Sequence, residues 1–307
     1  MLTSEQIVRL QALIASPDPD HQAQGLELLR LFPAQFRAVI DGIARIPEKL
    51  DLSRRDLRGL SLKQVHSNFA HLRAADLRGV QLQGAQLHNA DLRGADLRDA
   101  DLTGAWLGRA KLCAADLRGA RLKGAILYGA NLRDADLRGT DLSGAQCSTA
   151  CFKGASLTDT RLADAKFRKA SMSNRSFHRS MLLRADLRAT RWWNCDLSEA
   201  CLRSSDLREA RFAETTLRGA DLRNARLAGA HLPEADLSGA DLRNARLEGT
   251  CLRSANLRGA DLRGARLIDC DLSGAHLGGA RMSGVIWHTG QSVPSRSARV
   301  NAARRRQ

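Results

Sequence analysis

The sequence predicts a β-solenoid, in which the chain winds into stacked coils, and three observations indicate it. Leucine recurs at every fifth position, in a frame that holds from Leu52 to Trp287. Alanine usually precedes each leucine by two positions, and glycine often follows it by two. Aromatic residues make up only 4% of the chain, too few for an ordinary globular core. Because a period of five fits neither a helix nor a strand, we expect a corner every five residues, eased by glycine.

The repeated unit has the consensus Ala-Asp/Arg-Leu-Arg/Ser-Gly, as at residues 75–79. This pattern resembles the pentapeptide-repeat family, and the resemblance covers residues 50–288. It implies a right-handed quadrilateral β-helix with four units in each coil, so that the repeat makes about twelve coils. It also implies that the leucine column and the small-residue column both point inward.

One stretch of the repeat departs from the consensus in its interior positions. Leucine is replaced there by Cys147, Phe152, Phe167, Met172, Phe177, Trp192 and Phe212. The middle third is therefore predicted to pack differently, with a wider or kinked coil. Arg175 occupies a position meant for a small inward residue. Since a charge cannot be buried without a partner, we expect a local bulge that turns it outward.

The first 49 residues read as a small helical bundle. Thr3 and Gln6 have the spacing of a capping box before an apolar face. The Pro-rich stretch at 16–20 is interpreted as a break, followed by helices over 21–31 and 33–43. Because a bare solenoid end exposes unpaired edges, residues 1–49 are expected to cap the first coil; partner binding is the alternative.

The ends of the chain and its cysteines indicate in which cellular compartment the protein is expected. Residues 289–307 lack apolar periodicity and are predicted to be a disordered basic tail. No membrane-length apolar run and no signal peptide are found. The seven cysteines are odd in number and form no CxxC pair, which argues against a disulfide framework. We therefore expect a cytoplasmic protein that makes no membrane contact.

The repeat offers no set of residues for catalysis. Side chains meet when they differ by twenty positions or lie close along one coil, and His88, His178 and His276 have no histidine or cysteine at that spacing. Metal ligation needs three or four convergent donors. No Walker, dinucleotide or nucleophile-elbow motif occurs, and a leucine and alanine interior leaves no substrate cavity. We predict a protein that is not an enzyme, without catalytic residues, metal or cofactor.

The outward positions of the first half predict a charge-compensated surface. At a spacing of twenty, one column of aspartates lies beside one column of arginines on the same face. Like charges stacked at the strand spacing would repel one another without such neighbours. The residues concerned are Asp56, Asp76, Asp96, Asp116 and Asp136, with Arg58, Arg78, Arg98, Arg118 and Arg138.

The second half predicts an arginine-rich surface. Two arginine columns lie on either side of a corner, and Asp221, Asp241 and Asp261 can offset only one of them. Arginine binds phosphate oxygens through a two-pronged fork, and the chain carries a net charge of +15. These columns are therefore candidates for binding a polyanion in a salt-dependent manner. Their members are Arg203, Arg223, Arg243 and Arg263 in one column and Arg226, Arg246 and Arg266 in the other.

A small apolar cluster is predicted on the surface of the first half. Trp106 and Ile126 are stacked one coil apart at outward positions, and Tyr128 lies beside Ile126. Clustered outward apolar groups are typical of protein contacts. We interpret the cluster as a contact for a protein partner or for a second copy of the chain in a homodimer.

Three functions follow from these features. The first is a non-enzymatic binding or scaffold protein that presents charged columns to a macromolecular partner. The second is implied by the family resemblance: a DNA mimic that binds DNA gyrase and protects it from topoisomerase poisons, which would confer antibiotic resistance. The third is nucleic-acid binding through the arginine columns.

Overall fold

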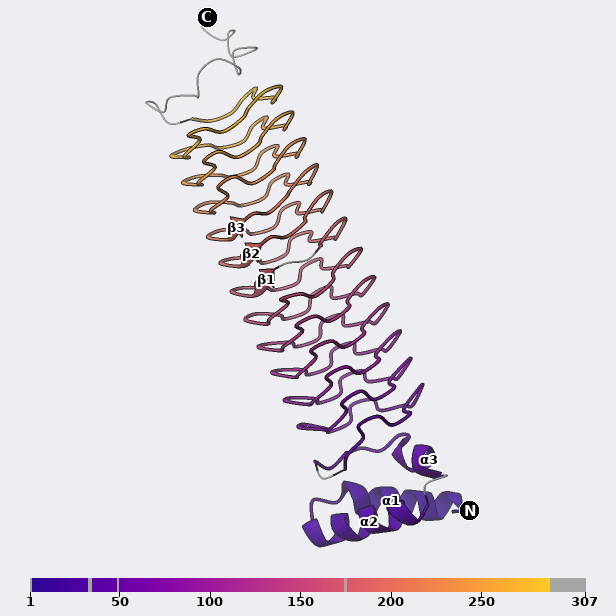
Figure 1. The fold of residues 1–307 in the computed structure, drawn as a ribbon. Helices are drawn as coiled ribbons and strands as arrows, with labels where there is room; N and C mark the ends of the chain where they lie inside the picture. The colour runs from indigo at the N-terminus through magenta and orange to yellow at the C-terminus, as the bar shows by residue number, and fades with distance from the viewer. Residues whose placement is uncertain (1, 33–34, 49, 174–175, 288–307) are drawn as a thin grey trace, which may run out of the picture. The chain divides into compact units, whose positions relative to one another are not determined.

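The computed structural model describes residues 2–32, 35–48, 50–173 and 176–287 (Figure 1). The predicted tail at 289–307 and the expected outward turn of Arg175 lie outside these residues. The chain divides into two compact units, Met1–Gln146 and Cys147–Gln307.

The first unit begins with helix α1 (Ser4–Ala15), whose start agrees with the predicted capping box. The Gln6 amide nitrogen donates to Thr3 Oγ1 at 3.3 Å, and the Thr3 amide nitrogen donates to Gln6 Oε1 at 2.8 Å. This reciprocal pair satisfies two of the amide groups that a helix start leaves without partners.

The other two helices correct the predicted boundaries. Helix α2 (Pro19–Leu31) begins inside the predicted break, because proline is favoured in a first helical turn and Asp18 caps the Asp20 amide. Helix α3 (Phe36–Ile40) is a short helix that ends well before Ile43. Helices α1 and α2 lie side by side (Figure 1).

The helical segment supplies partners to the exposed edge of the first coil. Arg37 donates to the carbonyl oxygens of Asp56 and Arg58, and its guanidinium also pairs with the Asp56 carboxylate at 2.8 Å. The Asp41 carboxylate accepts from the Ser61 amide at 2.7 Å. These contacts satisfy backbone groups that would otherwise form an unpaired edge.

The coils are held together by parallel bridges between residues twenty positions apart, such as Asp76 with Asp96 and Asp96 with Asp116. The Leu97 amide donates to the Asp116 carbonyl at 2.7 Å, and the Asp96 amide donates to the preceding coil. Each coil therefore hydrogen-bonds to the coil before it and the coil after it, and successive turns run side by side within each unit (Figure 1).

Most of the described five-residue units end in a tight turn. The Ala95 amide donates to the Leu92 carbonyl at 3.1 Å, and Gly94 between them has φ of +65°. A positive φ at the third residue is the signature of a type II turn, which glycine and asparagine adopt at least cost. Asn224, at the same position of a later unit, has φ of +57°. The corner predicted every five residues is confirmed.

The interior of each unit consists of the two predicted inward columns. Leu97 and Ala95 are fully buried, as are their counterparts in most coils. The alanine column leaves room for the leucines of the same coil, so the coil is filled by side chains along its length.

The middle stretch is packed around aromatic side chains, as predicted. Three parallel strands form here in one column, β1 (Ser171–Ser173), β2 (Arg191–Trp193) and β3 (Arg211–Ala213). The buried Trp192 ring stacks on Phe212 at 5.9 Å and meets Phe177 edge-on at 4.8 Å. Its Nε1 donates to Thr190 Oγ1 at 2.8 Å, so a polar residue in the alanine column satisfies the indole.

Candidate interaction surfaces

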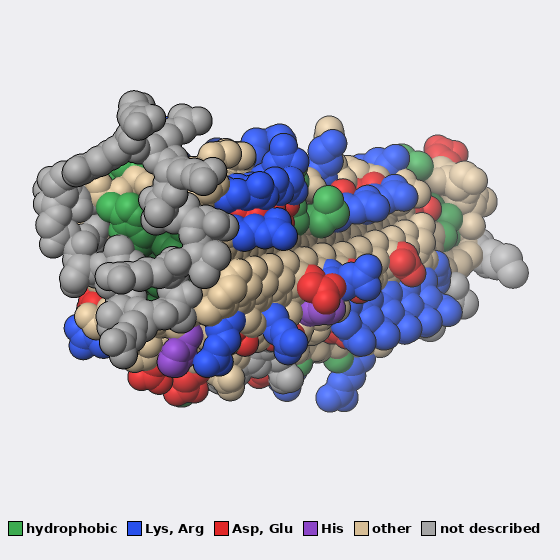
Figure 2. Space-filling view, turned by 90° about the horizontal axis from the view of Figure 1, so that it is seen from above, with side chains coloured by type: hydrophobic (Ala, Val, Ile, Leu, Met, Phe, Trp, Pro, Cys, Tyr) green, Lys and Arg blue, Asp and Glu red, His purple; other side chains and the backbone are tan. Residues whose placement is uncertain are grey.

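The first unit carries a continuous ladder of ion pairs. Arg78 binds the Asp76 carboxylate through two nitrogens, at 2.8 Å and 2.6 Å, and its Nε lies 3.6 Å from the Asp96 carboxylate of the next coil. The same arrangement recurs from Asp56 to Arg138. The predicted charge-compensated surface is confirmed. On the face seen in Figure 2, Lys and Arg side chains form bands with Asp and Glu side chains among them.

These pairs shift the ionisation of the carboxylates. Hydrogen bonds from the Arg98 side chain hold the pKa of Asp96 below its ordinary value, and Arg118 does the same for Asp116. The ladder is therefore fully charged at neutral pH, and each charge has a neighbour of opposite sign.

The second unit contains the same kind of ladder, and three of the predicted polyanion-binding arginines belong to it. We call Arg223, Arg243 and Arg263 the 223 column. Their Nε atoms donate to the aspartates two residues earlier at 2.8 Å, 2.9 Å and 2.9 Å. Hydrogen bonds from Arg223 and Arg263 lower the pKa of Asp221 and Asp261. Arg203, one coil before Arg223, lowers the pKa of Asp221 by charge alone.

The other three arginines are stacked without a matching acidic column. Arg226, Arg246 and Arg266, which we call the 226 column, form consecutive parallel bridges. Arg226 lies 3.9 Å from Asp206, a carboxylate that Arg208 already binds at 2.6 Å. Arg266 pairs with Glu248 at 2.7 Å. Within the described ranges, Arg246 has no ion-pair partner. The column thus keeps an excess of positive charge.

A shallow groove of about 620 Å³ runs beside the 226 column. It is also lined by residues at the turn position of successive coils, among them Asn224 and Asn244. Both have positive φ, so asparagine satisfies the turn and also places an amide beside the arginines. Amide and guanidinium groups together can donate to the oxygens of an anion.

The predicted apolar cluster of the first unit is exposed. Trp106 and Tyr128 have 56% and 52% of their surface accessible, and Trp106 forms a parallel bridge with Ile126. The structure thus brings the stacked pair together on the surface; the contact that they make with a partner stays a prediction.

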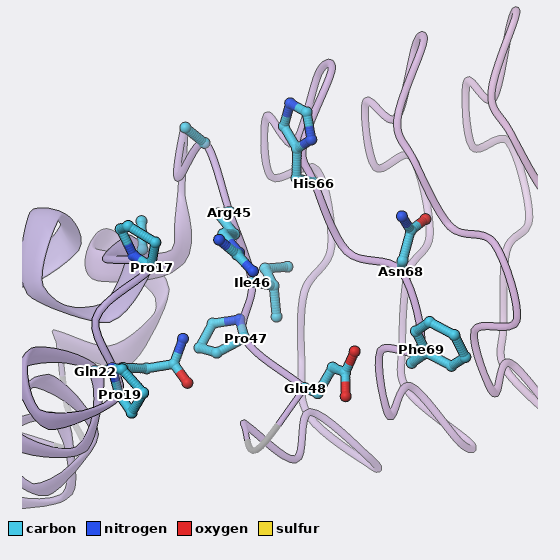
Figure 3. A pocket seen from close by; sticks show the side chains of 12 residues that line it. Pro17, Pro19, Gln22, Arg45, Ile46, Pro47, Glu48, His66, Asn68 and Phe69 are labelled. Atoms are coloured by element: carbon cyan, nitrogen blue, oxygen red, sulfur yellow. The ribbon is translucent and has the colours of Figure 1, made fainter.

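Sequence reasoning missed a pocket of about 770 Å³ near the helices of the first unit (Figure 3). Pro17 and Gln22 lie on one side, and His66, Asn68 and Phe69 lie on the other. Segment 44–48 runs between them. These walls come from parts of the chain far apart in sequence, so no local motif announces the pocket.

The buried thiols are poorly suited to chemistry. Burial raises the pKa of Cys147 and raises that of Cys270 to about 12, so both remain protonated at neutral pH. Over the described residues, no three His, Cys, Asp or Glu side chains are grouped for a metal ion. No helix in that part of the chain has the length and apolar character needed to cross a membrane.

Comparison with known protein families identifies one family. The family model of pentapeptide repeats matches in eight copies, over residues 51–94, 68–104, 105–144, 182–219, 220–259 and 250–286. A comparison with curated proteins gives no match.

Several solved structures resemble the chain. HetL, a pentapeptide repeat protein involved in heterocyst differentiation regulation in the cyanobacterium Nostoc, is 30% identical, with 86% of this chain and 97% of HetL covered and a TM-score of 0.39. A pentapeptide repeat protein of the Arabidopsis thaliana thylakoid lumen is 42% identical over 31% of this chain and 66% of its own, with a TM-score of 0.31. QnrB1, a plasmid-mediated fluoroquinolone resistance protein, is 19% identical over 75% of this chain and 89% of its own, with a TM-score of 0.32.

The sequence frame, the bridges at intervals of twenty residues and the family model all lead to one assignment. This chain belongs to the pentapeptide-repeat family, whose fold is a right-handed β-helix solenoid, here with a small helical N-terminus.

Proposed function

We propose that this chain is a non-enzymatic binding protein and that the 226 column contacts the backbone of a nucleic acid. The scaffold that we infer has four five-residue sides per coil and about twelve coils between residues 50 and 288. Residues 1–49 form its cap. The proposed site includes the 223 column and Arg203 as neighbours that steer the polyanion, and it lies in a cytoplasmic protein.

The observation that carries this proposal is the excess charge of the 226 column. Two unit charges about 5 Å apart in water repel by roughly 1 kcal/mol. In the 223 column each arginine is offset by an aspartate, whereas Arg246 has no such partner in the described part of the chain. A bound phosphate relieves the repulsion and gains two-pronged hydrogen bonds from arginine.

DNA mimicry directed at gyrase, the function implied by the family resemblance, needs an acidic face without counter-charges. The aspartates of the first unit, such as Asp96 and Asp116, are instead bound by arginines on both sides. This arrangement favours the nucleic-acid proposal. A supercoiling assay with gyrase and a poison would overturn that preference if stoichiometric protein protected the enzyme.

The proposal is tested by fluorescence anisotropy with labelled duplex DNA and RNA at low and moderate salt. Replacing Arg226, Arg246 and Arg266 together by glutamine is expected to weaken binding by at least about tenfold at low salt. The slope of log affinity against log salt should fall by about 3, because each phosphate contact contributes about one counterion.

A matched control removes the same charge elsewhere. Arg54, Arg73 and Arg133 are exposed arginines of the first unit, and their triple replacement by glutamine should change affinity several-fold less. Equal losses in the two variants would mean that net charge alone drives binding. Absence of binding by the unmodified chain at low salt would rule the proposal out.

A further inference from the structure

Two neighbouring outward columns of the first unit carry no formal charge between residues 66 and 146. Parallel bridges connect the outward side chains of one column from coil to coil. Its members are His66, Gln86, Trp106, Ile126 and Gln146. Two residues further along the chain, the next outward column is equally uncharged. Its members are Asn68, His88, Gly108 and Tyr128. We call these nine residues the neutral strip; elsewhere in the chain the outward positions are mostly charged, and charged residues make up 26% of the whole.

The centre of the neutral strip is shaped by a glycine. A Cβ atom at Gly108 would lie 2.6 Å from Nδ1 of His88, so the His88 ring occupies the space that any other residue would fill. Gly108 itself is buried, whereas Trp106 and Tyr128 on either side of it are more than half exposed. Two large rings therefore stand beside a position with no side chain.

The neutral strip continues into the pocket near the helices. His66 and Asn68 belong to the strip and also line the pocket, together with Phe69, whose side chain is 50% exposed (Figure 3). Pro17 and Pro47 add apolar surface on the other walls, and Arg45 and Glu48 line the pocket with one charge of each sign. A volume of about 770 Å³ is in the range of sites that hold small molecules or side chains.

The backbone of the neutral strip is already occupied. The Trp106 amide donates to the Ala85 carbonyl, and the Trp106 carbonyl accepts from the Leu87 amide. Addition of a partner's strand to this face is therefore excluded, and recognition must come from side chains. Trp and Tyr are the residues that most often dominate such contacts.

We propose that the neutral strip and the pocket form one docking site for an extended segment of a partner protein that carries no charge where it lies along the strip. One apolar side chain of the segment enters the pocket, and a second packs on Trp106 and Tyr128. This part of the segment lacks charge because a charged group placed on the strip would lose water without gaining an ion-pair partner among the strip's own side chains. Three coil steps separate Asn68 at the pocket from Tyr128. They amount to about 14 Å, which an extended chain spans in roughly four residues.

The test uses the full chain as bait for a library of short random peptides displayed on phage. Selected peptides are expected to carry two apolar residues about four positions apart, with no charged residue between them. Their affinity is then measured by anisotropy with labelled synthetic peptides. Trp106→Ser, Tyr128→Ser and Phe69→Ser should each weaken binding by at least about tenfold.

Trp193→Ser provides the matched control, because Trp193 is 52% exposed but lies in strand β2 of the second unit. It should leave peptide affinity unchanged, and circular dichroism should show that every variant keeps its fold. Gln86→Glu, which places one charge on the strip, should also weaken binding of the selected peptides.

Three results would overturn the proposal. Selected peptides could be acidic and depend on the 226 column, or their binding could be insensitive to Trp106→Ser and Phe69→Ser. A dimer in sedimentation equilibrium that Trp106→Ser dissociates would assign the strip to a second copy of the chain instead. The second and third of these results do not depend on whether the 226 column binds nucleic acid.

Discussion

At the same positions of the twenty-residue period, the two units carry different chemistry. The first unit has Gln86, Trp106 and Ile126 stacked in one column, whereas the second has Arg226 and Arg246. The leucine and alanine columns beneath them are buried alike in both units. The repeat therefore specifies the backbone through its inward residues and leaves the outward residues open to vary, so one scaffold supports two unrelated surfaces.

The comparison also separates two kinds of arginine. An arginine two residues after an aspartate, as in Asp221-Leu222-Arg223, folds back on that carboxylate. Arg226 and Arg246 follow alanine in the other outward position and have no aspartate two residues before them. Charge counted over a whole unit hides this difference, because only the first kind is held by a carboxylate two residues earlier in the chain.

The largest expected effect concerns the interior of the second unit. Trp192→Ala removes the stack on Phe212 and the edge contact with Phe177, and should lower the free energy of unfolding by about 3–5 kcal/mol. Trp193→Ala, at the neighbouring exposed residue, should change it by less than about 0.5 kcal/mol. Urea denaturation followed by circular dichroism measures both. Similar losses would show that the aromatic interior is not what stabilises this stretch.

A transplant tests whether the stacked arginines suffice for polyanion binding. Gln86→Arg, Trp106→Arg and Ile126→Arg together would copy the 226 column into the first unit. Affinity for duplex DNA at low salt should rise by about tenfold, since each phosphate contact releases counterions. Anisotropy measures the change.

The control for the transplant adds three arginines at scattered outward sites, Gln64, Cys113 and Ser143. If the scattered set raised DNA affinity as much as the stacked set, alignment in a column would have no part in binding.

A smaller effect on stability is expected at the turn residues that lie two positions before Trp106 in the first unit and before Arg226 in the second. The first unit has glycine there, and Gly104 has φ of +65° with nothing near an added Cβ. Gly104→Ala should therefore cost about 1 kcal/mol from backbone strain alone. Gly104→Asn, which copies Asn224 of the second unit, should cost only a few tenths, because asparagine tolerates this conformation. Thermal denaturation compares the two variants. An equal loss of stability in both would contradict the assignment of a type II turn.

The smallest effect is that of acid on the ion-pair ladder. The folded-state pKa of Asp96 is lowered, so its contribution to stability is present above the ordinary pKa and is lost as pH falls through the lowered one. Asp96→Asn with Arg98→Gln should give a shallower loss of melting temperature below about pH 4. The difference should stay below about 1 kcal/mol, because the pair is partly exposed. A steeper loss in the variant would reverse this prediction.

Most of the fold could be predicted because it is determined by the spacing of residues within each five-residue unit. An unbroken spacing of five places each leucine inside one coil, and the turn glycines follow from the same count. The start of α2 was predicted too late, because Pro17 and Pro19 look like a break although proline fits a first helical turn. The end of α3 was predicted too late as well, because apolar residues continue to Ile43 beyond the last helical turn.

The sequence by itself determined the coil, its inward columns, the repacked aromatic stretch and the membership of each outward column, because all of these depend only on spacing. The tertiary structure decided which arginines are bound by aspartates and which keep an excess of charge, since that depends on side-chain conformation. It also decided where Pro17, Pro47 and Phe69 meet around a pocket. Residues so far apart in the chain come together only through the packing of the helices against the first coils.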